Sequence, residues 1–166
     1  DEIEDLDVYR RTLKGMNPQV QIVFEDAEGE IEEVTEADLP FDVNAEVIEI
    51  PPEAYGIWYI DAMDHPEKYD GKTMRFKAMA YTGGRLPKGY FVPGRMAMTC
   101  CADDTAFIGF LCKSAYVDRI KSKQWLTVTA KAHIEKRAEY SGQEGLVLQS
   151  TNIKSAEKPE EELVYF

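Results

Sequence analysis

The chain has 166 residues, of which 44% are hydrophobic and 30% are charged, and its formal net charge at pH 7 is −12. That length and composition fit one folded domain, with or without an appendage. No run of 18 apolar residues is present, so no membrane-spanning segment is predicted, and the acidic opening DEIEDLD is unlike a signal peptide.

The negative charge is concentrated near the N-terminus. Residues 1–50 contain 16 acidic and 3 basic residues, whereas residues 51–166 contain 15 acidic and 16 basic residues. A polyanion meets no general electrostatic attraction from such a chain, so nucleic acid is not expected as a partner. We expect residues 1–46 to form an acidic N-terminal subregion, either packed on the following domain or loosely tethered to it.

The first predicted elements are short. Residues 1–16 have apolar positions near helical spacing and predict a helix, and residues 19–24 alternate and predict a strand. Another strand is predicted to end at Pro51. Residues 54–69 then predict a helix that is interrupted at Pro66, because proline cannot continue a helix without removing a backbone hydrogen bond.

From residue 71 onward the pattern is typical of β-strands. Residues 73–81 alternate, with Met74 and Phe76 on the inward face and Arg75 and Lys77 on the outward face. Pro93–Gly94 predicts a bulge or bend in the next strand. The remaining predicted strands are 106–112, which is apolar throughout, 124–137, which alternates, and 146–157. An acidic tail with an apolar end closes the chain.

Five strands with short connections and one preceding helix predict a mainly β fold. A small closed barrel removes the free edges that an open sheet would leave. We therefore expect an OB-like (oligonucleotide/oligosaccharide-binding) five-stranded β-barrel at residues 71–154, with the helix at 54–69 as its one covering helix and an acidic N-terminal appendage. The predicted division is an acidic subregion at 1–46 and an OB-like β-barrel domain at 47–166.

The three cysteines gather in one short region. Cys100 and Cys101 are adjacent and are followed by Asp103 and Asp104, and Cys112 lies on the next predicted strand. An odd number of cysteines leaves at least one thiol unpaired, so no disulfide scaffold is predicted. Thiolates and carboxylates within five residues can bind one soft metal ion such as zinc. Cys100, Cys101, Asp103 and Asp104 are therefore the candidate metal ligands.

The same run also fits a structural role. Neighbouring residues of a strand point to opposite faces, so Cys100 and Cys101 cannot share one metal ion without a bend. Free cysteine is often a small buried residue, and Asp103 and Asp104 can cap the amides of a turn. Both interpretations remain open from the sequence.

Thiol catalysis is not predicted, and the chain is not expected to be an enzyme. A nucleophilic cysteine needs a general base and an electropositive setting. The acids beside Cys101 oppose such a setting, and His65 and His133 are remote in the sequence and favour surface positions.

Several stretches resemble one known family. PEKYDGKTMRFKAMAY, YFVPGRMAMTCCADDTAFIGFLC, QWLTVTAKAHI and the closing EKPEEELVYF resemble the soluble C-terminal domain of the YcgQ-like family of Gram-positive membrane proteins. The most specific part is Arg95 together with the run from Cys100 to Asp104. The resemblance implies a parent protein anchored in the membrane, with this domain at the outward face of the cytoplasmic membrane. It also implies a larger predicted permease as the membrane partner.

Three functional hypotheses follow. The leading one is a non-catalytic binding or accessory domain of a membrane-anchored permease subunit, which binds a metal ion or a small ligand or docks on the permease partner. The alternative is a thiol redox module in which Cys100 or Cys101 exchanges with Cys112 or with a partner thiol. The third is OB-type nucleic-acid binding, in which exposed aromatic side chains stack on bases; the candidates are Tyr81, Tyr90 and Trp125.

Overall fold

The structure is a computed structural model and describes residues 39–98 and 105–165. This part of the chain is mainly β, with one α-helix and several short 3₁₀ turns. The strands are β1 (Val47–Glu49), β2 (Thr73–Tyr81), β3 (Tyr90–Met98), β4 (Thr105–Gly109), β5 (Cys112–Lys113), β6 (Trp125–Lys136), β7 (Glu144–Ser155) and β8 (Leu163–Tyr165). The helix is α2 (Tyr55–Asp64), and the 3₁₀ turns are η2 (Pro52–Ala54), η3 (Pro66–Lys68), η4 (Val117–Arg119) and η5 (Ala138–Tyr140).

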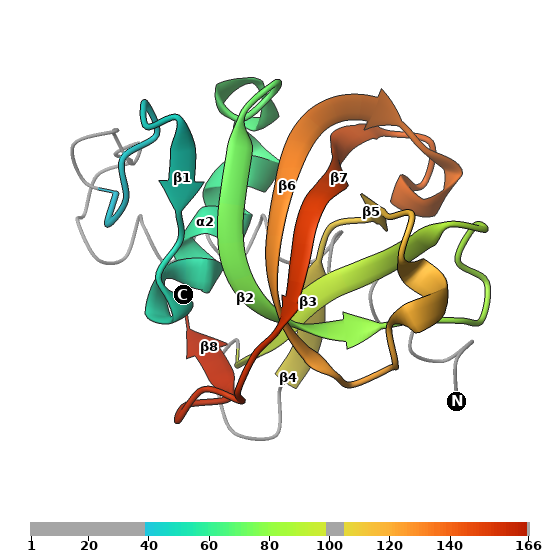
Figure 1. Cartoon of the computed structure of the whole chain (residues 1–166). Coiled ribbons are helices and arrows are strands. Elements are labelled where there is room, and N and C mark those ends of the chain that lie inside the picture. Colours follow the sequence, from blue (N-terminus) through green and yellow to red (C-terminus); the bar gives the residue numbers. More distant parts are fainter. Residues whose placement is uncertain (1–38, 99–104, 166) are drawn as a thin grey trace.

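All the strands belong to one sheet, in the order β1-β2-β6-β7-β5-β3-β4, with β8 paired to β3. β2 also pairs with β3, so five strands close a ring: β2-β3-β5-β7-β6 and back to β2. In Figure 1, β2, β6 and β7 run side by side at the front of the molecule, and β3 crosses behind them toward the loops at the right.

The core lies inside this ring because the strands alternate. In β2, Met74 and Phe76 are buried while Arg75 is exposed, as the sequence predicts. β6 continues the pattern, with Leu126 and Val128 buried. The helix α2 packs on one end of this core (Figure 1). Its Trp58 ring lies 5.0 Å from the ring of Phe76 and 5.5 Å from that of Phe110, measured between centroids.

The predicted helix at 54–69 is confirmed in its interrupted form. α2 ends at Asp64, and the short turn η3 follows from Pro66. The fully buried Tyr69 donates a hydrogen bond to the Asp61 carboxylate at 2.6 Å, and Lys68 contacts the same oxygen at 2.8 Å. The buried acid on the helix is therefore paired, which a buried carboxylate requires. No helix in the described residues is long and apolar enough to cross a membrane.

Two predicted elements differ in the structure. The apolar segment 106–112 is not one strand, because β4 ends at Gly109 and β5 begins at Cys112. β4 pairs with the second half of β3 and β5 with its first residues, so the chain changes position along β3 between them. The acidic tail ends in a strand, β8, that pairs in parallel with β3. The alternation of polar and apolar residues within a segment does not indicate which strand it pairs with, so neither the division into β4 and β5 nor the pairing of β8 with β3 could be predicted.

Residues 39–46 are the part of the predicted acidic subregion that the structure describes. Leu39 and Val43 are buried members of the main core, and the Lys72 ammonium donates a hydrogen bond to the Val43 carbonyl at 2.8 Å. The segment just before β1 therefore packs on the domain. The helix and strand predicted at residues 1–24 lie outside the described residues.

Candidate functional site

The predicted metal site cannot be placed on the fold, because Cys100, Cys101, Asp103 and Asp104 lie outside the described residues. They follow β3 and precede β4, which pair with each other. Among residues 39–98 and 105–165, no group of three or more histidine, cysteine or acidic side chains is arranged to hold a metal ion. The metal site stays a prediction.

Cys112 is the third predicted thiol and lies in the main core. Its side chain is fully buried, and its Sγ lies 3.8 Å from the carbonyl oxygen of Lys113. Burial raises the pKa of the thiol far above its ordinary value, because the thiolate would lose its hydration. The thiolate is the reactive form, so this environment opposes disulfide exchange at Cys112 in the folded protein.

A second hydrophobic cluster lies on the outer face of the ring. Its buried members are Val92, Leu111, Tyr140 and Val147. Three of these four residues have a sequence neighbour in the main core: Phe91 beside Val92, Cys112 beside Leu111, and Leu148 beside Val147. Because adjacent residues of an extended chain face opposite ways, the wall formed by β3, β5 and β7 carries apolar side chains on both sides at these three positions.

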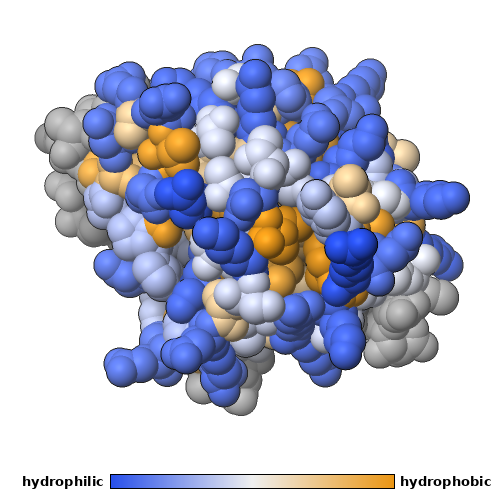
Figure 2. Space-filling view, in the orientation of Figure 1, coloured by the Kyte–Doolittle hydropathy of each residue, from blue (hydrophilic) through white to orange (hydrophobic). Residues whose placement is uncertain are grey.

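Half-buried side chains form the open edge of this cluster; they are Tyr81, Leu86, Tyr90 and Phe107. Tyr81 and Phe107 pack with ring centroids 6.3 Å apart. Figure 2 shows a patch of hydrophobic side chains surrounded by hydrophilic ones near the middle of the face that it draws. We call the eight residues of the second cluster and its edge the outer groove.

Two glycines let the strands approach closely beneath Phe107. Gly94 of β3 and Gly109 of β4 are directly paired. A Cβ atom on Gly94 would lie 2.3 Å from the Ile108 carbonyl oxygen and 2.5 Å from the Phe107 ring, so no side chain fits there. The absence of a side chain at position 94 therefore allows Phe107 to lie across β3 and into the outer groove.

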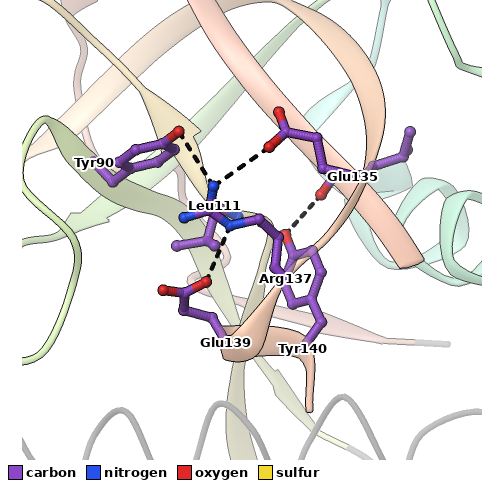
Figure 3. A network of polar contacts seen from close by, with 7 residues as sticks. Tyr90, Leu111, Glu135, Arg137, Glu139 and Tyr140 are labelled. Carbon is purple, nitrogen blue, oxygen red and sulfur yellow. Dashed lines mark hydrogen bonds and ion pairs between the residues drawn. The ribbon is translucent and has the colours of Figure 1, made fainter. Parts of the chain in front are cut away.

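Arg137 lies at one end of the outer groove, in a network of polar contacts (Figure 3). Its Nε donates to Glu139 at 3.0 Å, and its Nη1 donates to Glu135 at 3.3 Å and to the Tyr90 hydroxyl at 3.4 Å. The guanidinium also lies over the Tyr90 ring, 4.9 Å from the centroid. Partial desolvation acts to lower the pKa of Arg137, but Glu139 and Tyr90 outweigh it and the pKa is raised. Arg137 is thus a fixed cation.

Tyr140 fastens the loop that carries this network. Its hydroxyl donates to the Leu146 carbonyl at 2.6 Å and accepts from the Leu111 amide at 3.0 Å (Figure 3). Its ring leaves no room for a side chain at Gly145, where a Cβ would lie 2.8 Å away. The loop after β6 is therefore held rigidly against the wall that carries the outer groove.

The sequence predicts some of the residues of the outer groove. Tyr81 and Tyr90 were expected on a barrel face and both lie in the outer groove, whereas Trp125 lies elsewhere, with the Arg95 guanidinium 5.4 Å from its ring centroid. Phe107 and Arg137 were not predicted as site residues. One pattern in the sequence does point to this face. Neighbouring residues in β3 and in the segment 107–112 are apolar, which indicates a strand buried on both faces.

Comparison with known proteins assigns the chain to a family. Residues 26–166 match the DUF1980 C-terminal domain. The chain belongs to the DUF1980 C-terminal domain family. The match begins at residue 26, so it includes part of the predicted acidic subregion as well as the described fold. The family name states no activity, and no curated protein matches the chain.

Among solved structures, two crystal structures of Rim1, a mitochondrial single-stranded DNA binding protein of S. cerevisiae, are similar to part of the chain. Both have 13% sequence identity and cover 52% of this chain and 95% of Rim1, with TM-scores of 0.32 and 0.31. Likeness at this level supports no inference about the function of a DUF1980 C-terminal domain.

Proposed function

We propose that this DUF1980 C-terminal domain is a non-catalytic binding domain built on an OB-type barrel. The closed ring runs β2-β3-β5-β7-β6. If these five strands are numbered 1 to 5 in chain order, their order around the ring is 1-2-3-5-4. OB-type barrels bind ligands on the face of their second and third strands, between the loops that follow their first and fourth strands. In this chain those positions are β3 and β5 with the loops at 82–89 and 137–143.

The outer groove supports this proposal, because it occupies that same face. Val92 and Tyr90 come from β3, Leu86 from the loop 82–89, and Tyr140 from the loop 137–143. Half-buried aromatic side chains at a recess are typical of binding sites, since they offer apolar area at little cost in conformational entropy. This placement of a second hydrophobic cluster is the observation that carries the proposed function.

The chemistry of the groove favours an apolar segment of a partner protein as the ligand. Arg137, the cation at its end, already contacts Glu135, Glu139 and the Tyr90 hydroxyl, so that end is electrically balanced. An anionic ligand would have to displace two carboxylates. Apolar and aromatic side chains at the centre with paired charges at the rim are the usual composition of a protein interface.

The resemblance to the YcgQ-like family suggests which protein docks there. We propose that the domain is the outward accessory domain of a membrane-anchored permease subunit and that its outer groove docks on the larger permease partner. The proposed metal site at Cys100, Cys101, Asp103 and Asp104 is separate from this groove proposal. Metal analysis of protein purified without chelator tests it directly.

Co-purification with the permease partner tests the docking proposal. Leu86→Glu places a charge at the edge of the outer groove, whereas Ile57→Glu places one on α2, where Ile57 is 39% exposed. We expect Leu86→Glu to weaken binding of the purified partner by about tenfold or more, because the docked complex would bury an unpaired carboxylate in an apolar contact, and Ile57→Glu to leave it unchanged. Thermal unfolding of both variants checks that each is folded. Equal binding by the two folded variants would contradict the proposal.

A further inference from the structure

A second surface lies on the outward side of β2, β6 and β7, and it is basic. The paired rows of these strands bring together Lys77, Thr127 and Lys154 in one row and Thr73, Lys131 and Gln149 in another. Directly paired residues project to the same face of a sheet. The row between them contains Arg75, Thr129 and Asn152. We call these nine residues the basic face.

The basic face combines cations with neutral hydrogen-bonding groups. Its four cations are Arg75, Lys77, Lys131 and Lys154. The rows lie two or three residues apart along strands of ordinary spacing, so the four charges fall within roughly 15 Å of one another. These cations lie in residues 51–166, where 16 basic residues accompany 15 acidic ones, whereas residues 1–50 contain 16 acidic and 3 basic residues. Together the four cations create a local positive potential that attracts an acidic segment.

One acidic residue from the N-terminal side already contacts this face. Glu49 of β1 is paired in register with Arg75 of β2, and their side chains form an ion pair. Arg75 in turn donates to the Thr129 hydroxyl at 3.1 Å. β1 is the edge strand beside β2, so the chain that enters β1 arrives along the border of the basic face (Figure 1).

The sequence that precedes this border is strongly acidic. Residues 25–38, EDAEGEIEEVTEAD, contain eight acidic residues and no lysine or arginine. We propose that this segment docks on the basic face of its own chain, with its carboxylates opposite Lys77, Lys131 and Lys154, while Arg75 keeps Glu49 as its partner. The occupant is thus part of the same molecule, and charge complementarity together with the Glu49–Arg75 pair indicates where it binds.

The connection is long enough and the tether favours the contact. Fourteen residues can extend over about 46 Å, whereas three neighbouring strands span only about 10 Å from first to last. A segment attached to the surface it binds has an effective concentration in the millimolar range, so several weak ion pairs suffice. Exposed pairs contribute little one by one and are screened by salt. The docking should therefore weaken at high ionic strength.

Carbodiimide cross-linking of the whole chain tests the proposal, because it joins a carboxylate to a lysine amine only where the two are in contact. We expect residues 25–38 to be joined to Lys77, Lys131 and Lys154 at least several-fold more than to Lys88 and Lys121, which are exposed lysines outside the basic face. Adding 0.5 M salt, where the Debye length is roughly 4 Å, should abolish this preference.

Two controls make the result decisive. Replacing Glu28, Glu30, Glu32 and Glu33 with glutamine should leave fewer cross-links to the basic face and an unchanged unfolding transition. Mixing isotopically labelled and unlabelled chains separates contacts within one chain from contacts between chains. Equal cross-linking to control and face lysines, or cross-links mainly between differently labelled chains, would overturn the proposal.

Discussion

Arg95 shows how the fold places a charged side chain in its interior. It is 1% exposed, and its guanidinium donates to the carbonyl oxygens of Pro52 at 3.2 Å, Glu161 at 2.9 Å and Glu162 at 3.3 Å. It also contacts the face of Trp125. Burial lowers its pKa, while the nearby Tyr55 and Glu161 act to raise it. Carbonyl oxygens therefore take the place of water at the two Nη groups of this cation, whereas its Nε has no hydrogen-bond partner among the described residues.

The buried position of Cys112 predicts that its thiol is unreactive in the folded protein. In a Cys100→Ser/Cys101→Ser chain it is the remaining thiol, and it should not react with a thiol reagent in the folded protein at pH 8, because burial keeps it protonated and inaccessible. The thiol should appear stoichiometrically in denaturant. Thiol titration with and without urea measures both states.

A rapid, stoichiometric reaction of native Cys112 would contradict the buried position and would restore the redox hypothesis. The raised pKa of Cys112 also predicts how stability depends on pH. Any stability that the protonated thiol contributes is fully present below the ordinary pKa of a thiol, and it decreases as the pH rises above that value. The unfolding free energy should thus fall above about pH 8.5.

At the scale of elements, Arg95 fastens β8 to the sheet. β8 is only three residues long, pairs with β3, and follows the two carbonyls that Arg95 binds. Arg95→Met removes the charged donor from these carbonyls, which should cost about 1–3 kcal/mol of unfolding free energy. Backbone amides of β8 should exchange with solvent markedly faster in this variant.

The matched control for that prediction is Lys158→Met on the same tail. Lys158 pairs with Glu162 at 2.6 Å, but both side chains are more than half exposed, so the loss should stay below about 1 kcal/mol. Similar costs for the two variants, or unchanged exchange in β8 after Arg95→Met, would show that the tail is held by other contacts.

Elements with clear alternation could be predicted from the sequence, and elements that depend on distant partners could not. β2 and β6 carry polar residues on one face, so their inward and outward sides were predictable at Met74, Arg75 and Val128. The division between β4 and β5 at Phe110–Leu111 depends on pairing with β3 and β7. The strand at Leu163–Tyr165 likewise depends on β3 and on Arg95. Local patterns contain no information about those partners.

At the scale of the whole molecule, the candidate site was predictable only in part for the same reason. Tyr81 and Tyr90 were candidates because aromatic residues stood out on predicted strands. The outer groove also needs Leu86, Phe107 and Tyr140, which come together only when the ring closes. A wall that is apolar on both sides looks in the sequence like any deeply buried strand, so the second cluster is not distinguishable there from the main core.

The whole fold also explains why the outer groove and the basic face can act independently. The groove is centred on β3, β5 and β7 near the loops at 82–89 and 137–143, and it reaches β2 only at its last residue, Tyr81. The row of the basic face that contains Lys154 lies toward the other end of β7 from Val147. A charge change at Lys154, seven residues along β7 from Val147, should therefore leave partner docking unaffected. The two proposals can fail separately.

Site-specific photo-cross-linking tests the central claim, that the outer groove is the binding face. A photoreactive phenylalanine analogue is placed at Leu86 in one chain and at Ile57 in another, and each is irradiated with the membrane-embedded permease partner. We expect covalent adducts with the partner from position 86 and none above background from position 57. Adducts from position 57 with none from position 86, in chains that unfold at the same temperature, would contradict it.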